Sequence, residues 1–276
     1  MCSEEERALY AEQGFLVVDG IYSKETMDEC CREYDAMFAR AKERGDKIEA
    51  TWKGDWKTEK EKAGKMEMLS IHNIQFHSAT FTQMMLNPKL SDVIADLMGT
   101  NDIELHHTKA HIKPPHHGSR FPMHQDYQYF PHAKDSMIAV FIHLEDVDIK
   151  NGCLAVYPGS HKLGYLKDFG SQGYHYVDPN EYTIEKASPV KAKRGQVVIF
   201  PYTLVHGSYI NTSDVPRRMI LFQIRAADDY PTREIHISPG QGLMLRGTKK
   251  NVDANIDLRH LHGKEAVEPE PKKLKT

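Results

Sequence analysis

The chain has 276 residues, of which 40% are hydrophobic and 27% are charged, and its formal net charge is −3. This length and hydrophobic content favour one large domain with a buried core over two small domains. The nearly balanced charge excludes a global basic field of the kind that holds nucleic acid or an anionic membrane, so we expect neither partner.

The first hundred or so residues are predicted to be largely helical. Ser23–Gly45 opens with a serine suited to an N-cap and ends on a glycine that can adopt a left-handed cap, which predicts one long amphipathic helix. A second helix is expected over roughly His77–Met98, where apolar residues recur at helical spacing around Pro88 and Gly99 follows. Both helices are expected to act as scaffold.

From Ile103 the chain changes to short segments with strand-like alternation, separated by Pro, Gly and Asn turns. The expected strands lie in IELHHTKAHIK, MIAVFIHLED, GCLAVYPGS, GQVVIF and RRMILFQI. Many short strands at irregular intervals predict a barrel or a double-sheet jelly roll. We therefore expect a mainly β fold with flanking helices: one domain over residues 1–246, with its core at about 101–226, followed by a polar, mobile tail at 247–276.

No membrane span or secretory signal is expected. The longest apolar runs, such as Met137–Leu144, are too short to cross a bilayer, and the acidic MCSEEER start lacks a basic-then-apolar layout. The four cysteines, including the adjacent Cys30 and Cys31, form neither a disulfide framework nor a Cys-x-x-Cys metal spacing. We expect an intracellular, cytoplasmic protein with reduced, structural cysteines; the sequence gives no prediction of its oligomeric state.

The stretch FPMHQDYQYFPH at Phe121–His132 contains the first candidate site. In an extended segment His124 and Asp126 project to the same side, because strand side chains alternate with a period of two. His206, in the distant segment VVIFPYTLVHGSYIN, supplies a third ligand. Two histidines and one carboxylate occupy one face of an iron(II) ion and leave the other face for a co-substrate, a substrate and O2.

Two simpler interpretations stand beside this one. With sixteen histidines in the chain, accidental His-x-Asp/Glu pairs are common, and His143–Glu145 is a second such pair. The first stretch could also be a His-rich surface loop. Further evidence comes from HGSYINTSDVPRRMILF, where Arg217 and Arg218 open the strand after His206. A buried arginine near an open metal face suits a dicarboxylate co-substrate, whereas the other arginine must face the opposite side of the strand.

Taken together, HQD, NGCLAVYPGSHKLG at Asn151–Gly164, GQVVIF and HGSYINTSDVPRR resemble the phytanoyl-CoA dioxygenase family of iron(II)- and 2-oxoglutarate-dependent oxygenases. The similarity runs in order from about Ala11 to Ile224. It implies a double-stranded β-helix of the jelly-roll, cupin-like kind. It also implies that the metal ligands are His124, Asp126 and His206, and that Arg217 and Ser208 bind 2-oxoglutarate.

The resemblance also concerns the strand at Ile103–Lys113, which lines the co-substrate and substrate pocket in the family. His107, Lys109, His111 and Lys113 share one face of that strand. We expect Lys109 and His111 to bind the co-substrate and His107 to meet the substrate; a solvated edge strand is the competing interpretation. Tyr127 and Tyr129 could wall the substrate site just beyond the metal or belong to the core.

The implied activity is hydroxylation of an unactivated C–H bond of a small molecule, with iron(II), 2-oxoglutarate and O2, and release of succinate and CO2. Desaturation stays open. One alternative is an acyl-CoA 2-hydroxylase of the phytanoyl-CoA type, although the final KKLKT lacks a Ser-Lys-Leu peroxisomal ending. A different class of function is a non-catalytic jelly-roll module that binds iron and 2-oxoglutarate. The His and Lys side chains of Ile103–Lys113 favour a polar or anionic substrate.

Overall fold

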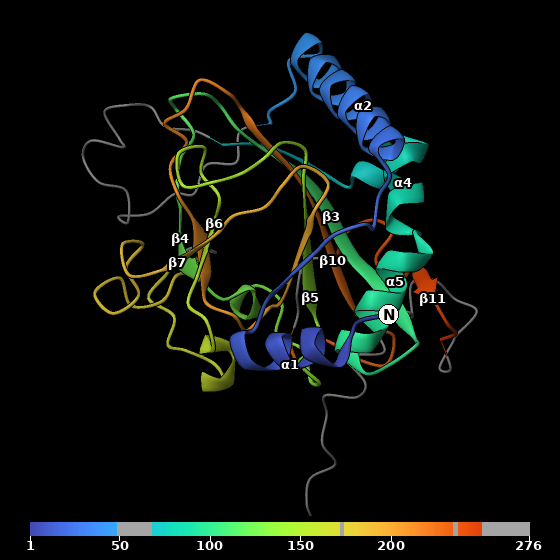
Figure 1. The fold of residues 1–276 in the computed structure, drawn as a ribbon, viewed down its shortest axis with the longest axis vertical. Helices are drawn as coiled ribbons and strands as arrows, with labels where there is room; N and C mark the ends of the chain where they lie inside the picture. The colour runs from blue at the N-terminus through green and yellow to red at the C-terminus, as the bar shows by residue number, and fades with distance from the viewer. Residues whose placement is uncertain (49–67, 172–173, 234–236, 250–276) are drawn as a thin grey trace, which may run out of the picture.

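Two antiparallel sheets form the centre of the molecule (Figure 1). The computed structural model describes residues 1–48, 68–171, 174–233 and 237–249. Within them, the larger sheet runs in the order β1 (Leu16–Val18), β8 (Val197–Pro201), β5 (Ile138–His143), β10 (Arg217–Ala226), β3 (Ile103–Lys113) and β11 (Met244–Arg246), and β2 (Leu69–His72) also pairs with β3. The smaller sheet runs β4 (Phe121–His124), β9 (His206–Ser208), β6 (Leu154–Val156) and β7 (Ser188–Val190). From β3 to β10 the chain crosses repeatedly between the two sheets.

The larger sheet is apolar on both faces, and its residues alternate between two environments. On β10, Ile220, Phe222 and Ile224 belong to the core beneath the helices, whereas Met219 and Leu221 belong to a second core shared with the smaller sheet. This alternation follows from the period of two in a strand. The inner face of β10 therefore looks into the space between the sheets.

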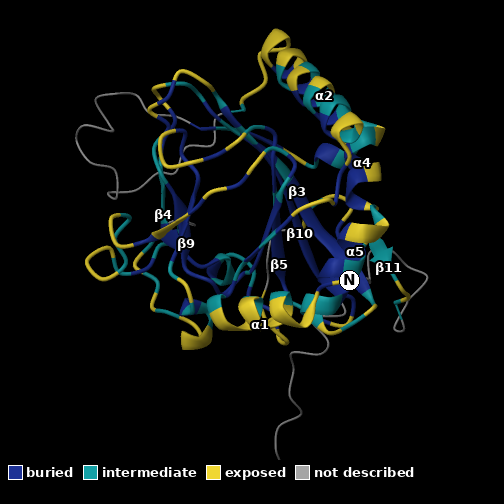
Figure 2. Ribbon diagram, viewed as in Figure 1, coloured by how far each residue is buried: buried dark blue, intermediate teal, exposed yellow. Residues whose placement is uncertain are grey.

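Helices cover the outer face of the larger sheet (Figure 1). These helices are α2 (Lys24–Glu43), α4 (Ala79–Met85) and α5 (Pro88–Met98), while α1 (Glu4–Gln13) runs along the bottom of the view in Figure 1. Three short 3-10 turns occur elsewhere along the chain: η1 (Ile74–Phe76) follows β2, η2 (Asp126–Gln128) follows β4, and η3 (Ser160–Leu163) follows β6. The long helix predicted from Ser23 is present, and the Ser23 side chain caps it by accepting from the N–H of Thr26. The outward residues of α1 and α2 are exposed while the strands behind them are buried (Figure 2).

The single helix predicted over His77–Met98 is wrong: the structure has two helices there. Asn87 adopts an extended conformation with ψ 123°, and its side chain accepts from the backbone N–H groups of Lys89 and Leu90. Pro88 occupies the first position of α5, where its missing N–H costs nothing. A proline disfavours helical backbone in the residue before it, so α4 ends before Asn87 and a new helix starts. Gly99, with φ 72°, ends α5 as predicted.

A β-bulge in β3 changes which residues enter the space between the sheets. Gln223 of β10 pairs with His107, and the next residue Ile224 pairs with Leu105, so His106 is the extra residue. The rings of His106 and His107 consequently lie on the same side, with their Nδ1 atoms 2.7 Å apart. Beyond the bulge Glu104 also lies inside, where it forms an ion pair of 2.6 Å with Arg225.

Part of the predicted C-terminal tail lies within the described residues. Lys249 Nζ is 2.7 Å from Glu104 Oε2, so the chain is held against the barrel up to this point. Residues 250–276 lie outside the described residues, and the predicted single domain and mobile tail stay predictions. Among the described helices, none combines the length and the apolar character needed to cross a membrane.

Candidate metal centre and its cavity

His124, Asp126 and His206 converge at the open edge of the smaller sheet. His124 ends β4, His206 begins β9, and the two residues are paired in the β4–β9 ladder. Gln125 stays extended, and Asp126 begins the turn η2. Among the described residues these three form the one group of metal-ligand type, with one donor atom from each residue lying within 4.8 Å of the others.

The hydrogen bonds of the two histidines determine which nitrogen faces the centre. His124 Nδ1 is 2.8 Å from the Pro122 carbonyl and His206 Nδ1 is 2.9 Å from the Leu204 carbonyl. A carbonyl only accepts, so each Nδ1 carries the proton and donates it. Each Nε2 is left with a lone pair directed at Asp126, whose Oδ1 lies 3.5 Å from one and 3.7 Å from the other. Such outer hydrogen bonds are the usual means of orienting metal-binding imidazoles.

The charges of the group also suit a cation. Burial opposes ionisation of Asp126, but His206 and His124 outweigh it and lower the pKa of Asp126 to about 2. Burial, followed by the neighbouring His124, lowers the pKa of His206 to about 4. At neutral pH the centre therefore offers one carboxylate and a neutral imidazole at His206, with no thiolate. This donor set fits iron(II) better than a structural zinc ion.

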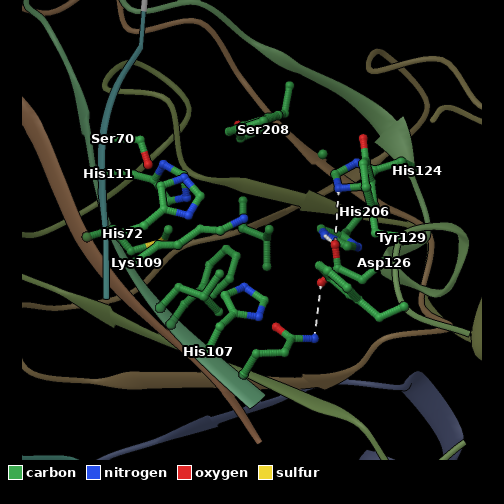
Figure 3. Close-up of a pocket in the computed structure, with 18 of the residues that line it drawn as sticks. Ser70, His72, His107, Lys109, His111, His124, Asp126, Tyr129, His206 and Ser208 are labelled. Atoms are coloured by element: carbon green, nitrogen blue, oxygen red, sulfur yellow. Dashed lines mark hydrogen bonds and ion pairs between the residues drawn. The ribbon is translucent and has the colours of Figure 1, made fainter. Parts of the chain in front are cut away.

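A cavity of about 240 Å³ opens beside this group, between the two sheets (Figure 3). The triad forms one wall, and Ser70, His72, Lys109 and His111 from β2 and β3 form the wall opposite (Figure 3). Apolar side chains complete the lining, namely Phe121, Phe130, Phe141, Leu154, Met219 and Leu221. The cavity thus places polar groups around a largely apolar interior next to the candidate metal centre.

Arg217 lies at one end of the cavity and is 2% exposed. Its Nε and Nη2 each lie 3.1 Å from the carbonyl of Gly152, and Nη1 lies 3.6 Å from Met219 Sδ. Burial lowers its pKa, and no carboxylate forms an ion pair with it in the described part of the chain. A buried guanidinium without an acidic partner is a strong indication of an anionic ligand.

Arg218, its neighbour, faces the other way. Its Nη1 lies 2.8 Å from Asp35 of α2, and its Nε lies 3.1 Å from Glu145. The strand geometry therefore separates a cavity arginine from a surface arginine.

A second buried basic residue, Lys113, lies beside Arg217. Lys113 is fully buried, and its Nζ donates to Ser208 Oγ at 2.7 Å and to the carbonyl of Tyr209. Burial, followed by the charge of Arg217, lowers the pKa of Lys113 well below its usual range. Because Ser208 Oγ accepts from Lys113 Nζ, the hydroxyl hydrogen of Ser208 is free to point to another acceptor.

The other predicted site residues divide into two groups. His107, Lys109, His111, Tyr129 and Ser208 all line the cavity. The structure does not place Tyr127 there: its ring stacks on that of Tyr165 at 3.7 Å between centroids. Burial lowers the pKa values of His107 and His111 well below their usual range, and it also lowers that of Lys109, against the opposing effect of Asp126.

The competing pair His143 and Glu145 does not form a metal site within the described residues. Glu145 pairs with Arg218, while His143 is fully buried between the sheets, and neither of its ring nitrogens has a hydrogen-bond partner among the residues that the structure describes.

Several lining residues were missed by the sequence interpretation. Met219, Leu221 and Gln223 follow Arg217 at intervals of two along β10, so the alternation of that strand could have identified them. Ser70, His72 and Tyr174 come from segments with no distinguishing pattern. Gln223 is notable because its Nε2 lies 3.4 Å from Asp126 Oδ2, directly behind the candidate metal ligand.

Comparison with known proteins identifies a family. Residues 10–219 match the family model described as phytanoyl-CoA dioxygenase (PhyH). A probable alpha-ketoglutarate-dependent hypophosphite dioxygenase of Stutzerimonas stutzeri is 26% identical over 84% of this chain and 81% of its own length. The peroxisomal phytanoyl-CoA dioxygenase of Mus musculus is 29% identical over 81% of this chain and 68% of its own. The ectoine dioxygenase of Bordetella bronchiseptica is 25% identical over 75% and 70%.

Solved structures share the fold. The epimerase SnoN, in complex with Fe3+, alpha ketoglutarate and nogalamycin RO, superposes with a TM-score of 0.70 over 89% of this chain and 96% of its own, at 20% identity. EctD from S. alaskensis, with 2-oxoglutarate and 5-hydroxyectoine, gives 0.63 over 83% and 78%, also at 20% identity. The predicted mainly β, jelly-roll architecture is therefore confirmed.

Proposed function

Because the chain belongs to the phytanoyl-CoA dioxygenase family, it is an iron(II)- and 2-oxoglutarate-dependent dioxygenase, and we propose that His124, Asp126 and His206 hold its iron. The observation that carries this proposal is the convergence of the three side chains beside a cavity that also contains an unpaired, buried Arg217. When bound at such a centre, iron with O2 converts 2-oxoglutarate to succinate and CO2 and supplies the oxidant for a C–H bond of the substrate.

The chain's own residues divide the remaining work. Arg217 binds the distal carboxylate of 2-oxoglutarate bidentately through two N–H groups. The Ser208 hydroxyl, which accepts from Lys113, donates to the same carboxylate. Phe141, Leu154 and Met219 exclude water from the carbon chain between the two ends. Gln223 holds the carboxylate of Asp126 in position from behind. The co-substrate roles predicted for Lys109 and His111 stay predictions.

A small substrate is supported in two ways. The cavity volume of about 240 Å³ is below the range of about 300–1,000 Å³ that drug-sized ligands need, which leaves little room for an acyl-CoA inside the barrel. The relatives named for hypophosphite, L-proline and ectoine are named for small polar molecules. The acyl-CoA alternative and an intracellular, cytoplasmic location stay predictions.

The test is succinate release by the purified full chain supplied with iron(II), 2-oxoglutarate and O2, alone and with a panel of small amines, amino acids, phosphonates and acyl-CoA thioesters. We expect slow release without substrate, and a rise with one small polar class. Binding of iron and 2-oxoglutarate with no succinate under any condition would identify a non-catalytic binding module instead.

A further inference from the structure

The cavity wall opposite the triad carries buried polar atoms that no described residue of the chain satisfies. Ser70 Oγ, His107 Nε2 and His111 Nδ1 are buried without a hydrogen-bond partner, and so is Gln223 Oε1 on the adjoining strand. All four residues line the cavity and are at most 8% exposed. Orphaned polar groups of this kind are costly unless a ligand satisfies them. The wall formed by β2 and β3 is thus built to contact a polar molecule.

Lys109 supplies the charge of this wall. It comes from the middle of β3, and in Figure 3 its side chain extends from that wall into the space facing the triad. It makes no hydrogen bond or ion pair with any residue of the described chain; burial lowers its pKa, against the opposing effect of the Asp126 carboxylate. If Asp126 holds the metal, this ammonium has no ion-pair partner in the part of the chain that the structure describes.

The charges around the cavity leave one positive charge in excess. The lining contains two cations, Lys109 and Arg217, and one carboxylate, Asp126. An iron(II) ion and a 2-oxoglutarate dianion cancel each other and leave that balance unchanged. Since both carboxylates of 2-oxoglutarate already have partners, at the metal and at Arg217, the excess charge at Lys109 favours an anion on the second molecule in the cavity.

His107 adds a second polar group beside Lys109. Its Nδ1 lies 2.7 Å from His106 Nδ1, so one ring donates to the other. Its Nε2 is buried and has no hydrogen-bond partner among the described residues. When His106 is the donor of the pair, the remaining proton of His107 lies on Nε2, where it can be donated to a ligand.

From these contacts we propose that Lys109, with His107, binds the oxyanion of a small substrate, a carboxylate or a phosphonate, beside the metal centre. The two residues are two positions apart on one strand face, so their donors can meet one anion. Gln223 Oε1, the unpartnered acceptor nearby, suits a hydroxyl or ammonium group on the same substrate. The inference rests on the proposed function, because it places 2-oxoglutarate at Arg217.

The experiment distinguishes two possible ligands of Lys109: an oxyanion of the substrate and a carboxylate of 2-oxoglutarate. Full-length protein with iron(II), under anaerobic conditions, is titrated calorimetrically with 2-oxoglutarate. The saturated complex is then titrated with propanoate, ethylphosphonate and the neutral propanamide. Each titration is repeated with Lys109→Met, which keeps the chain length without the charge, with Lys109→Arg, and with the exposed Lys162→Met as the matched control.

We expect the two anions to bind at least about tenfold more tightly than propanamide, as one charge-assisted contact allows. Lys109→Met should remove that preference and change the affinity for 2-oxoglutarate less than about threefold, while Lys109→Arg keeps part of it and Lys162→Met keeps all of it. Equal binding of propanoate and propanamide to the wild-type protein would overturn the inference. So would a Lys109→Met protein that loses 2-oxoglutarate affinity but keeps anion binding.

Failure of the proposed function has a different signature. The same preparations are assayed in air for succinate release without any probe, which depends on the metal and Arg217 but not on the oxyanion subsite. Absence of succinate together with Lys109-dependent anion binding would reject the catalytic proposal and keep the subsite. Succinate release without any preference for the anionic probes would keep the catalytic proposal and reject the oxyanion subsite.

Discussion

His124 and His206 are paired directly across the β4–β9 ladder, and their ring centroids lie 4.2 Å apart. Residues distant in the sequence thereby present two Nε2 atoms to the same carboxylate of Asp126. Strand pairing between β4 and β9 therefore places two of the three ligands opposite each other, although their positions in the chain are more than eighty residues apart.

The first prediction concerns this triad. His124→Ala, Asp126→Ala and His206→Ala should each weaken iron(II) binding by at least about a hundredfold and abolish succinate release. The protein supplies three ligands and the remaining metal ligands are exchangeable, so the loss of one protein ligand is severe. Iron content after dialysis and succinate release measure the two effects, with the exposed His117→Ala as the control. Wild-type activity in Asp126→Ala would mean that the ligand assignment is wrong.

The second prediction separates the adjacent arginines. Arg217→Ala should raise the 2-oxoglutarate concentration for half-maximal succinate release by about a hundredfold, because a buried charge-assisted pair is lost. Arg217→Lys should restore little, since an ammonium cannot form the planar two-point contact. Arg218→Ala removes contacts to Asp35 and Glu145 on the outer side and should change that concentration less than about twofold. A larger defect in Arg218→Ala than in Arg217→Ala would reject the co-substrate assignment.

The third prediction concerns Lys113, which acts through Ser208. Lys113→Met and Ser208→Ala should each raise the 2-oxoglutarate concentration for half-maximal succinate release by about tenfold. The double variant should need no more 2-oxoglutarate than the more impaired of the two single variants, because the two side chains form one hydrogen-bonded unit. The double-mutant cycle in 2-oxoglutarate affinity measures this coupling, with the exposed Lys191→Met as the control. Fully additive effects would show that Lys113 does not act through the hydroxyl.

The fourth prediction is a pH dependence of stability. Burial lowers the pKa of His143 to about 3, whereas an unfolded histidine titrates near 6.5. Between these values the unfolded chain binds more protons, so the stability present above pH 6.5 is lost as the pH falls. Replacing His143 by Gln should reduce the loss in unfolding free energy between pH 7.5 and pH 5 by about 2 kcal/mol.

Urea unfolding of the metal-free protein at the two pH values gives this difference, and the exposed His117→Gln is the control. An unchanged pH dependence in His143→Gln would show that His143 is not held in its neutral form.

The sequence alone determined the features that depend on local pattern. Ser23 predicted the start of α2 because a serine side chain caps free N–H groups of the first turn. The spacing of His124 and Asp126, with His206 far downstream, gave the candidate ligands, and the alternation of Arg217 and Arg218 predicted opposite faces. Joint motifs then identified the family that the comparisons confirm.

Tertiary structure decided what depends on contacts between distant segments. The alternation of side chains along a strand does not predict the extra residue His106, which forms a bulge opposite β10. Because of this bulge, Glu104 lies on the inner face of β3, where it pairs with Arg225. The ring of Tyr127 stacks on that of Tyr165 and does not line the cavity. Buried Lys113 donates to Ser208 of β9 and to the carbonyl of the following Tyr209, almost one hundred residues away in the chain. Each outcome is set by packing and hydrogen bonds between segments far apart in the chain, which local propensity does not encode.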